Sequence, residues 1–334
     1  MGVEGAVMEK TAEFLSIDSI ADARFDERDY LKTGIEKLDK AIVGLGLGHL
    51  VIVTGPRAGG KTTLIGQIAN NFVDRGYKGL IASFEMSNPR LKNWLELQAL
   101  GPENLRGFTT SNGKELFYPR TADVKQSVET WLGKGLKIYN NASFKRGDIS
   151  EAIAKEVEKM PDLKFVIIDN LMKIEFDGMA DSKWEAQSQI VKRLQRYAQE
   201  HHICMILVAH PNKVKTLPRI EDVGGSGDII NAADTVLLMH RVTKDFKKRA
   251  DEAFGWKEGN PAFEYSNIIE VAKDREFGAD DTMVGVYFDP RSKRFLNYPG
   301  EEIRYGWEVS PTQEKIAIGE VTLTELRDDE EAPF

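Results

Sequence analysis

Residues 55–62 read Gly-Pro-Arg-Ala-Gly-Gly-Lys-Thr, and this stretch decides the fold of the chain. It fits the pattern G-x-x-x-x-G-K-[ST], in which glycines allow backbone N–H groups to close around a polyphosphate. The apolar run 49–54 before it is typical of a buried parallel strand. Residues 63–73 after it are typical of a helix, whose N-terminus favours anions. This order predicts a nucleotide site rather than a chance glycine-rich turn.

The loop also predicts individual contacts. Lys61 can reach the β- and γ-phosphates, and Thr62 can offer its hydroxyl to Mg²⁺. The expected cofactors are therefore ATP, or another NTP, and Mg²⁺. The residues expected to bind the nucleotide here are Gly55, Ala58, Gly59, Gly60, Lys61, Thr62 and Thr63.

Composition limits the class of protein. The chain has 334 residues, of which 41% are hydrophobic, and no apolar run is long enough to span a bilayer. No basic region followed by an apolar one opens the sequence, so we expect no signal peptide, no membrane association and a cytoplasmic location. The single cysteine, Cys204, lies in an apolar run and is expected in the core.

Charge is unevenly distributed along the chain. The net charge is −8, and residues 301–334, with ten acidic and three basic residues, account for −7 of it. The remainder of the chain is close to neutral. Local basic loops could therefore still bind phosphates.

Strands and helices alternate from about residue 33 to residue 299, which predicts an α/β fold with a mostly parallel central sheet and helices on both faces. We divide the chain into an arm with a short amphipathic helix (1–30), a motor-sized domain (31–299) and an acidic tail (300–334). The expected strands are 49–54, 79–84, 164–168, 203–209 and 234–239, and the expected helices are 61–74, 88–100, 149–159 and 184–200. Segments 265–272 and 282–288 predict a C-terminal hairpin at the sheet edge, and 102–120 is expected to be an irregular surface insertion. Asp148 and Glu151 resemble a capping box, and Pro89 suits a first helical position.

Polar residues follow three of the predicted strands. Asp169 ends the apolar run 165–168 and is the candidate second ligand for Mg²⁺. Glu85 follows the strand at 79–84 and is the candidate base that orients and deprotonates water, although a helix-entry glutamate would look the same. His210 follows 203–209 and is interpreted as a γ-phosphate sensor, with a structural histidine as the alternative. Ligands of parallel sheets bind at this carboxyl edge.

Five motifs in order resemble those of DnaB-type and Twinkle-type replicative DNA helicases. They are Thr33-Gly34-Ile35-Glu36-Lys37-Leu38-Asp39, the phosphate loop, Phe84-Glu85-Met86-Ser87, Ile168-Asp169-Asn170-Leu171 and Val208-Ala209-His210-Pro211. The Gly-rich segment 224–234 and Lys273-Asp274-Arg275 extend the resemblance, which covers about residues 30–298. It implies a RecA-like motor domain that assembles as a hexameric ring around single-stranded DNA.

The resemblance also implies further site residues. Arg275, and with it Lys273, would reach the nucleotide site of a neighbouring subunit, and Arg241 would lie near the nucleotide, with a solvated charge on an edge strand as the alternative. Phe288 would lie against the adenine, with a core position as the alternative. The expected DNA contacts fall on the loop 213–227 and, as a second candidate, on 177–183. The DNA-binding candidates are Lys213, Lys215, Arg219, Gly225, Ser226 and Gly227.

The function that the sequence favours is an ATP-driven replicative helicase motor, of phage or similar origin. A RecA/RadA-type recombinase and a KaiC-like protein-binding ATPase are the alternatives. The expected partners are single-stranded DNA and further copies of the chain. The acidic tail, which ends in Pro333-Phe334, is expected to contact a DNA polymerase or primase.

Overall fold

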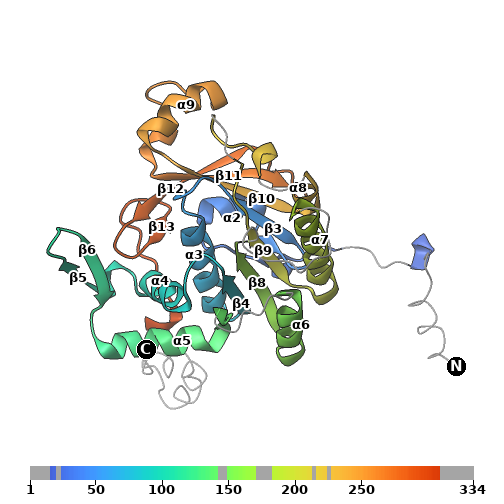
Figure 1. Cartoon of the computed structure of the whole chain (residues 1–334), viewed down its shortest axis with the longest axis horizontal. Helices are drawn as coiled ribbons and strands as arrows, with labels where there is room; N and C mark the ends of the chain where they lie inside the picture. Colours follow the sequence, from blue (N-terminus) through green and yellow to red (C-terminus); the bar gives the residue numbers. More distant parts are fainter. Residues whose placement is uncertain are drawn as a thin grey trace, which may run out of the picture.

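The computed structural model describes residues 16–19, 24–141, 149–170, 183–212, 216–223 and 227–308. The predicted amphipathic helix of the arm and the capping residue Asp148 lie largely or wholly outside these ranges. A nine-stranded sheet in the order β13-β12-β11-β10-β3-β9-β8-β4-β7 forms the centre of the molecule (Figure 1). Its strands are β3 (Leu50–Thr54), β4 (Lys78–Ser83), β7 (Leu136–Ile138), β8 (Leu163–Asp169), β9 (Cys204–Val208), β10 (Thr235–Arg241), β11 (Asn267–Asp274), β12 (Thr282–Asp289) and β13 (Arg294–Leu296).

The sheet is parallel from β10 to β7 and antiparallel from β10 to β13. The five predicted parallel strands are all present, and the predicted hairpin is β11–β12. The hairpin extends the sheet beyond β10, and the short strand β13 adds the last position. The α/β prediction with an added C-terminal hairpin is therefore confirmed.

Helices cover both faces, as predicted. They are α2 (Glu36–Ile42), α3 (Lys61–Asp74), α4 (Asn88–Leu100), α5 (Ala122–Gly135), α6 (Ile149–Lys159), α7 (Lys183–His201), α8 (Gly227–Ala232) and α9 (Lys244–Phe254). Apolar side chains of α2, α3, α4 and α5 pack on one face of the sheet, and those of α6, α7 and α8 pack on the other. None of the helices in the described ranges is long and apolar enough to cross a membrane.

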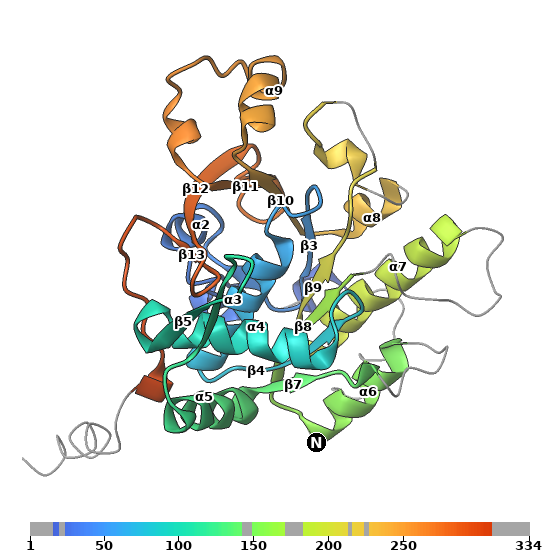
Figure 2. The ribbon, with the colours of Figure 1, turned by 60° about the vertical axis from the view of Figure 1, so that its left-hand side comes forward.

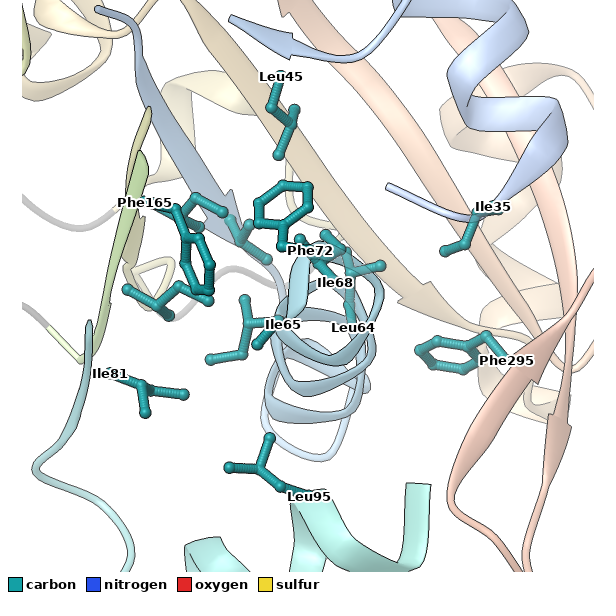
Figure 3. Close-up of a cluster of buried hydrophobic side chains, with 14 of the residues drawn as sticks. Ile35, Leu45, Leu64, Ile65, Ile68, Phe72, Ile81, Leu95, Phe165 and Phe295 are labelled. Atoms are coloured by element: carbon teal, nitrogen blue, oxygen red, sulfur yellow. The ribbon is translucent and has the colours of Figure 1, made fainter. Parts of the chain in front are cut away.

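The helix α3 is central to the larger core. Leu64, Ile65, Ile68 and Phe72 lie along it, and all are fully buried (Figure 3). The ring of Phe72 meets that of Phe165 on β8 with centroids 5.0 Å apart. Because burial of such side chains contributes on the order of 2 kcal/mol each, this packing fixes the helix that begins at the phosphate loop.

Residues 102–120 differ from the prediction of an irregular insertion. They form an antiparallel hairpin of β5 (Leu105–Thr109) and β6 (Glu115–Pro119), which projects beside α4 and α5 (Figure 1). Backbone pairing across five residue pairs bonds the N–H and C=O groups that face the partner strand, so a Gly-containing, polar sequence is still ordered as strands. A small two-stranded ribbon of β1 (Tyr30–Leu31) and β2 (Leu45–Gly46) was also not predicted.

The helix α9 connects β10 to β11 and projects beyond the sheet in both views (Figure 2). It has a separate small core in which Phe246 is buried against Leu217 and Ile268. Aromatic rings of Phe254 and Trp256, 4.9 Å apart, close this core. This separate core stabilises the position of α9.

Candidate active site at the phosphate loop

The phosphate loop connects β3 to α3 through backbone conformations that favour glycine. Gly55 has φ 137° and Gly60 has φ 104°. A Cβ on Gly55 would lie 2.4 Å from the carbonyl oxygen of Met239, and one on Gly60 would lie 2.7 Å from the Phe295 ring. Both positions therefore exclude side chains by backbone conformation and by space.

Lys61 is the first residue of α3 and is buried. Its Nζ donates to the carbonyl oxygens of Gly55 (2.7 Å) and Pro56 (2.9 Å). Burial lowers the pKa of Lys61 to about 8, while the carboxylates of Glu85 and Asp169 act in the opposite direction. A polyphosphate beside this ammonium group would favour its charged form.

Thr62 and Asp169 come together as predicted. The Thr62 hydroxyl donates to Asp169 Oδ2 at 3.1 Å, and Asp169 is buried at the end of β8. A hydroxyl and a carboxylate fit Mg²⁺, which usually takes one or two protein ligands and fills its shell with water and phosphate oxygens. The described residues contain no group of three or more His, Cys, Asp or Glu side chains that could hold a metal alone.

Glu85 and His210 meet at the same edge. His210 Nε2 lies 2.6 Å from Glu85 Oε1, and the two side chains are 27% and 28% exposed. The Asn170 amide also donates to Glu85 Oε1. The three side chains follow β9, β4 and β8, which are neighbours in the sheet, so that they meet at its carboxyl edge.

A pocket of about 670 Å³ opens in front of the loop. Arg241 and Phe288, expected near the nucleotide, both line it. Arg241 ends the interior strand β10, so the alternative of an edge-strand charge does not apply. The lining residues that the sequence reasoning missed are Arg57, Trp94, Asn170, Asn267 and Phe295.

Two of the missed residues form hydrogen bonds with predicted site residues. Asn170 contacts Glu85, and its place next to Asp169 was a usable signal. Asn267 is buried on β11, and its Nδ2 donates to the carbonyl oxygen of Gly59 at 2.9 Å. Nothing in the sequence around Asn267 indicates this contact, because it joins residues 208 positions apart.

Arg275 and Lys273 lie at the opposite end of the sheet from the pocket. Strand β11 runs antiparallel to β10, so that Asn267 pairs with Arg241 beside the pocket and Asp274 pairs with Thr235 at the far end. Neither Arg275 nor Lys273 lines the pocket of its own chain. Any nucleotide contact by them would have to be with another subunit.

Most of the predicted DNA-binding positions fall outside the described residues. These positions are Lys213, Lys215, Gly225 and Ser226, together with most of the segment 177–183. Gly227 begins α8. The Arg219 guanidinium lies 4.7 Å from the ring centroid of Phe254 and donates to the carbonyl oxygen of Ala253 on α9. Its observed contacts are therefore structural, and a DNA contact by Arg219 stays a prediction.

The sequence of the chain is similar to those of known proteins. The family described as "DnaB-like helicase C terminal domain" matches residues 30–297. The chain is 27% identical over 254 residues to the replicative DNA helicase DnaB of Mycoplasma pneumoniae, covering 72% of this chain and 52% of that protein. It is 25% identical over 305 residues to DnaB of Leifsonia xyli, covering 88% and 62%. The chain thus spans about half the length of the first of these relatives.

Solved structures agree on the fold. A protein described as an ATPase domain matches with a TM-score of 0.60 and 20% identity, covering 88% of this chain and 97% of that domain. A DnaB-like replicative helicase, solved in a study of its interactions with primase, matches with a TM-score of 0.61 and 19% identity, covering 88% and 67%. The fold is therefore the RecA-like α/β fold of these ATPase domains. From its matched residues and its fold, this chain belongs to the DnaB-like helicase C-terminal domain family.

Proposed function

We propose that the chain is the ATP-driven motor of a replicative DNA helicase, which hydrolyses NTP and translocates on single-stranded DNA to unwind duplex. The observation that carries the proposal is the convergence of Lys61, Asp169, Glu85 and His210 at one edge of the sheet, in a member of a helicase family. In ATP hydrolysis these four groups would contact the phosphates, hold Mg²⁺ and activate water.

The residues divide the chemistry between them. Glu85, oriented by Asn170 and His210, would accept a proton from the attacking water. Lys61 would exchange its two carbonyl partners for phosphate oxygens. Thr62 and Asp169 would hold Mg²⁺, which would neutralise charge on the phosphates. His210, which contacts Glu85, would act as the sensor of the γ-phosphate.

The site would be completed by a second copy of the chain. Arg275 follows the end of β11 that is farther from the pocket of its own chain. An arginine supplied in trans is a recurrent means of stabilising phosphoryl transfer. This favours nucleotide hydrolysis at subunit interfaces in a ring, for which a hexamer is the expected size. Single-stranded DNA would pass the loop 213–227.

Two measurements separate this function from its alternatives. Single-stranded DNA should stimulate ATP hydrolysis by the wild type, whereas Lys61→Ala should be inactive with and without DNA. Hydrolysis that ignores DNA would favour a KaiC-like ATPase. Electron microscopy with an ATP analogue and single-stranded DNA should show closed rings, and continuous filaments would instead favour a recombinase.

The acidic tail is proposed to contact a DNA polymerase or primase. Residues 326–334 lie outside the described part of the chain, and the proposal rests on their acids and terminal Phe334. Deleting them should leave ATPase and DNA binding intact and reduce coupled strand-displacement synthesis. Undiminished coupled synthesis would reduce the tail to a solvated end. A cytoplasmic location also stays a prediction.

A further inference from the structure

Lys273 and Arg275 bind the C-terminal end of α8 in their own subunit. Lys273 Nζ donates to the carbonyl oxygens of Ile230 (2.8 Å) and Ala233 (2.7 Å). Arg275 Nη2 donates to the carbonyl oxygen of Asn231 at 2.7 Å. Two cations thus contact carbonyl groups at the C-terminal end of a helix, where the helix dipole favours positive charge.

Asp234 completes this arrangement. Its Oδ1 accepts from Arg275 Nη1 at 2.7 Å, and its Oδ2 accepts from the backbone N–H of Leu50 at 2.9 Å. The Asp234 backbone is fixed as well, because its N–H donates to the carbonyl of Leu50 and its own carbonyl accepts from Arg275 N–H. The carboxylate is therefore anchored to the first residue of β3, the strand that leads into the phosphate loop.

These contacts hold the Arg275 guanidinium and still leave some of its N–H donors for a ligand. A guanidinium carries five N–H donors, and the two contacts with Asp234 and Asn231 take two of them. Three donors remain for a ligand, and the Arg275 side chain is 49% exposed. An unrestrained arginine loses about 2 kcal/mol of rotamer entropy when it is ordered. Ordering it in advance lowers that cost at the moment of reaction.

We propose that Asp234 is a positioning residue, which orients Arg275 toward the nucleotide site of the neighbouring subunit. This inference rests on the proposed shared site. It also links that site to DNA, because α8, whose last carbonyls hold both cations, begins at Gly227 immediately after the segment expected to bind DNA. Movement of α8 would move the guanidinium of the same subunit.

The substitution Asp234→Asn tests the inference. The amide oxygen can still accept from Leu50 N–H, whereas the Nδ2 group would face the guanidinium with a donor in place of a charge. We expect kcat for DNA-stimulated ATP hydrolysis to fall about 10- to 100-fold, since misplacing a catalytic group by about 1 Å costs this much. KM for ATP should change less than about twofold, because the pocket lies at the other end of the sheet. Asp251→Asn, which removes an exposed carboxylate paired with Lys257, is the matched control and should have no effect.

Epistasis distinguishes positioning from a general structural role. In an Arg275→Ala background, adding Asp234→Asn should lower kcat no further. Mixing Asp234→Asn subunits with Lys61→Ala subunits should restore hydrolysis, because the first keep intact pockets and the second keep positioned arginines. If Asp234→Asn does not fold, Asp234→Glu, which keeps the charge but moves the carboxylate, is compared in its place, and its defect in kcat should likewise disappear in the Arg275→Ala background.

The outcomes separate the positioning role of Asp234 from the proposed nucleotide site shared between subunits. A strong defect in Arg275→Ala with normal turnover in Asp234→Asn would overturn the inference and leave the shared site intact. Additive defects in the double variant would overturn it too, since the carboxylate would then act through the fold. Normal turnover in Arg275→Ala would instead overturn the shared site itself.

Discussion

At the scale of single residues, the reactive edge is organised around one carboxylate. Glu85 Oε1 receives contacts from both Asn170 and His210, each from a different strand. A general base needs a fixed orientation toward its water more than it needs a large pKa shift. As the proposed base, Glu85 would take that orientation from these two partners.

Glu85→Gln should therefore bind ATP with near wild-type affinity and hydrolyse it at least about 100-fold more slowly, because the amide keeps the shape and loses the basic oxygen. Nucleotide binding by fluorescence and single-turnover hydrolysis measure the two quantities separately. Glu36→Gln, which alters an exposed glutamate on α2, serves as the control. Turnover near the wild-type rate in Glu85→Gln would remove Glu85 from the role of base.

The residues found from sequence and those missed differ in a physical way. Asp169 ends a parallel strand, and Glu85 and His210 lie within two residues of the end of one, where the sheet fixes their position. Lys61 belongs to the phosphate-loop motif, whose spacing identifies it. Asn267 reaches the site along an antiparallel strand and bonds to the backbone of Gly59. Such a contact depends on strand order, which no local pattern encodes.

At the scale of elements, the five interior parallel strands were predictable because a mostly apolar run, largely buried in the sheet, marks each of them. The helix α5 was overlooked, although Val124, Val128, Trp131 and Leu132 are spaced as one helical face. Strand β7 has three residues and lies at the edge of the sheet beside β4, so its sequence carries little signal. The hairpin β5–β6 is ordered by its own cross-strand pairs.

Lys213 and Lys215 belong to the segment 213–227, which is expected to contact DNA. Replacing both Lys213 and Lys215 with alanine should weaken single-stranded DNA binding and flatten its dependence on salt, because fewer counterions are released per complex. Basal ATPase should survive. A salt titration of DNA affinity measures the slope, with the double variant Lys247→Ala and Lys248→Ala on α9 as a control of equal charge change. An unchanged slope would exclude the two loop lysines from the DNA path.

At the scale of the whole molecule, one buried arginine on β13 connects the end of α4 with the C-terminal part of the described chain. The Arg294 guanidinium is 1% exposed and donates to carbonyl oxygens of Gln98, Ala99 (2.9 Å) and Ile303 (2.6 Å). It also lies over the ring of Tyr305, and burial lowers its pKa. It joins the end of α4 to the last described segment of the chain.

Arg294→Met should lower the free energy of unfolding by about 3 kcal/mol, because three carbonyl groups lose a charged donor in a buried place. Arg291→Met is the matched control. That exposed side chain donates to the carbonyl oxygen of Pro102, and its loss should cost under about 1 kcal/mol. Denaturant titration compares the two, and equal small losses would show that Arg294 does not secure this end of the domain.

The most direct test of the whole account is displacement of a labelled strand from a forked duplex. We predict that the wild type displaces the strand with ATP, and that neither Glu85→Gln with ATP nor the wild type with a non-hydrolysable analogue does so. The same preparations should form rings on the fork, so that assembly and motion are scored separately. Vigorous DNA-stimulated hydrolysis with no displacement, on forks bearing either a 5′ or a 3′ tail, would contradict the assignment of this chain as a helicase motor.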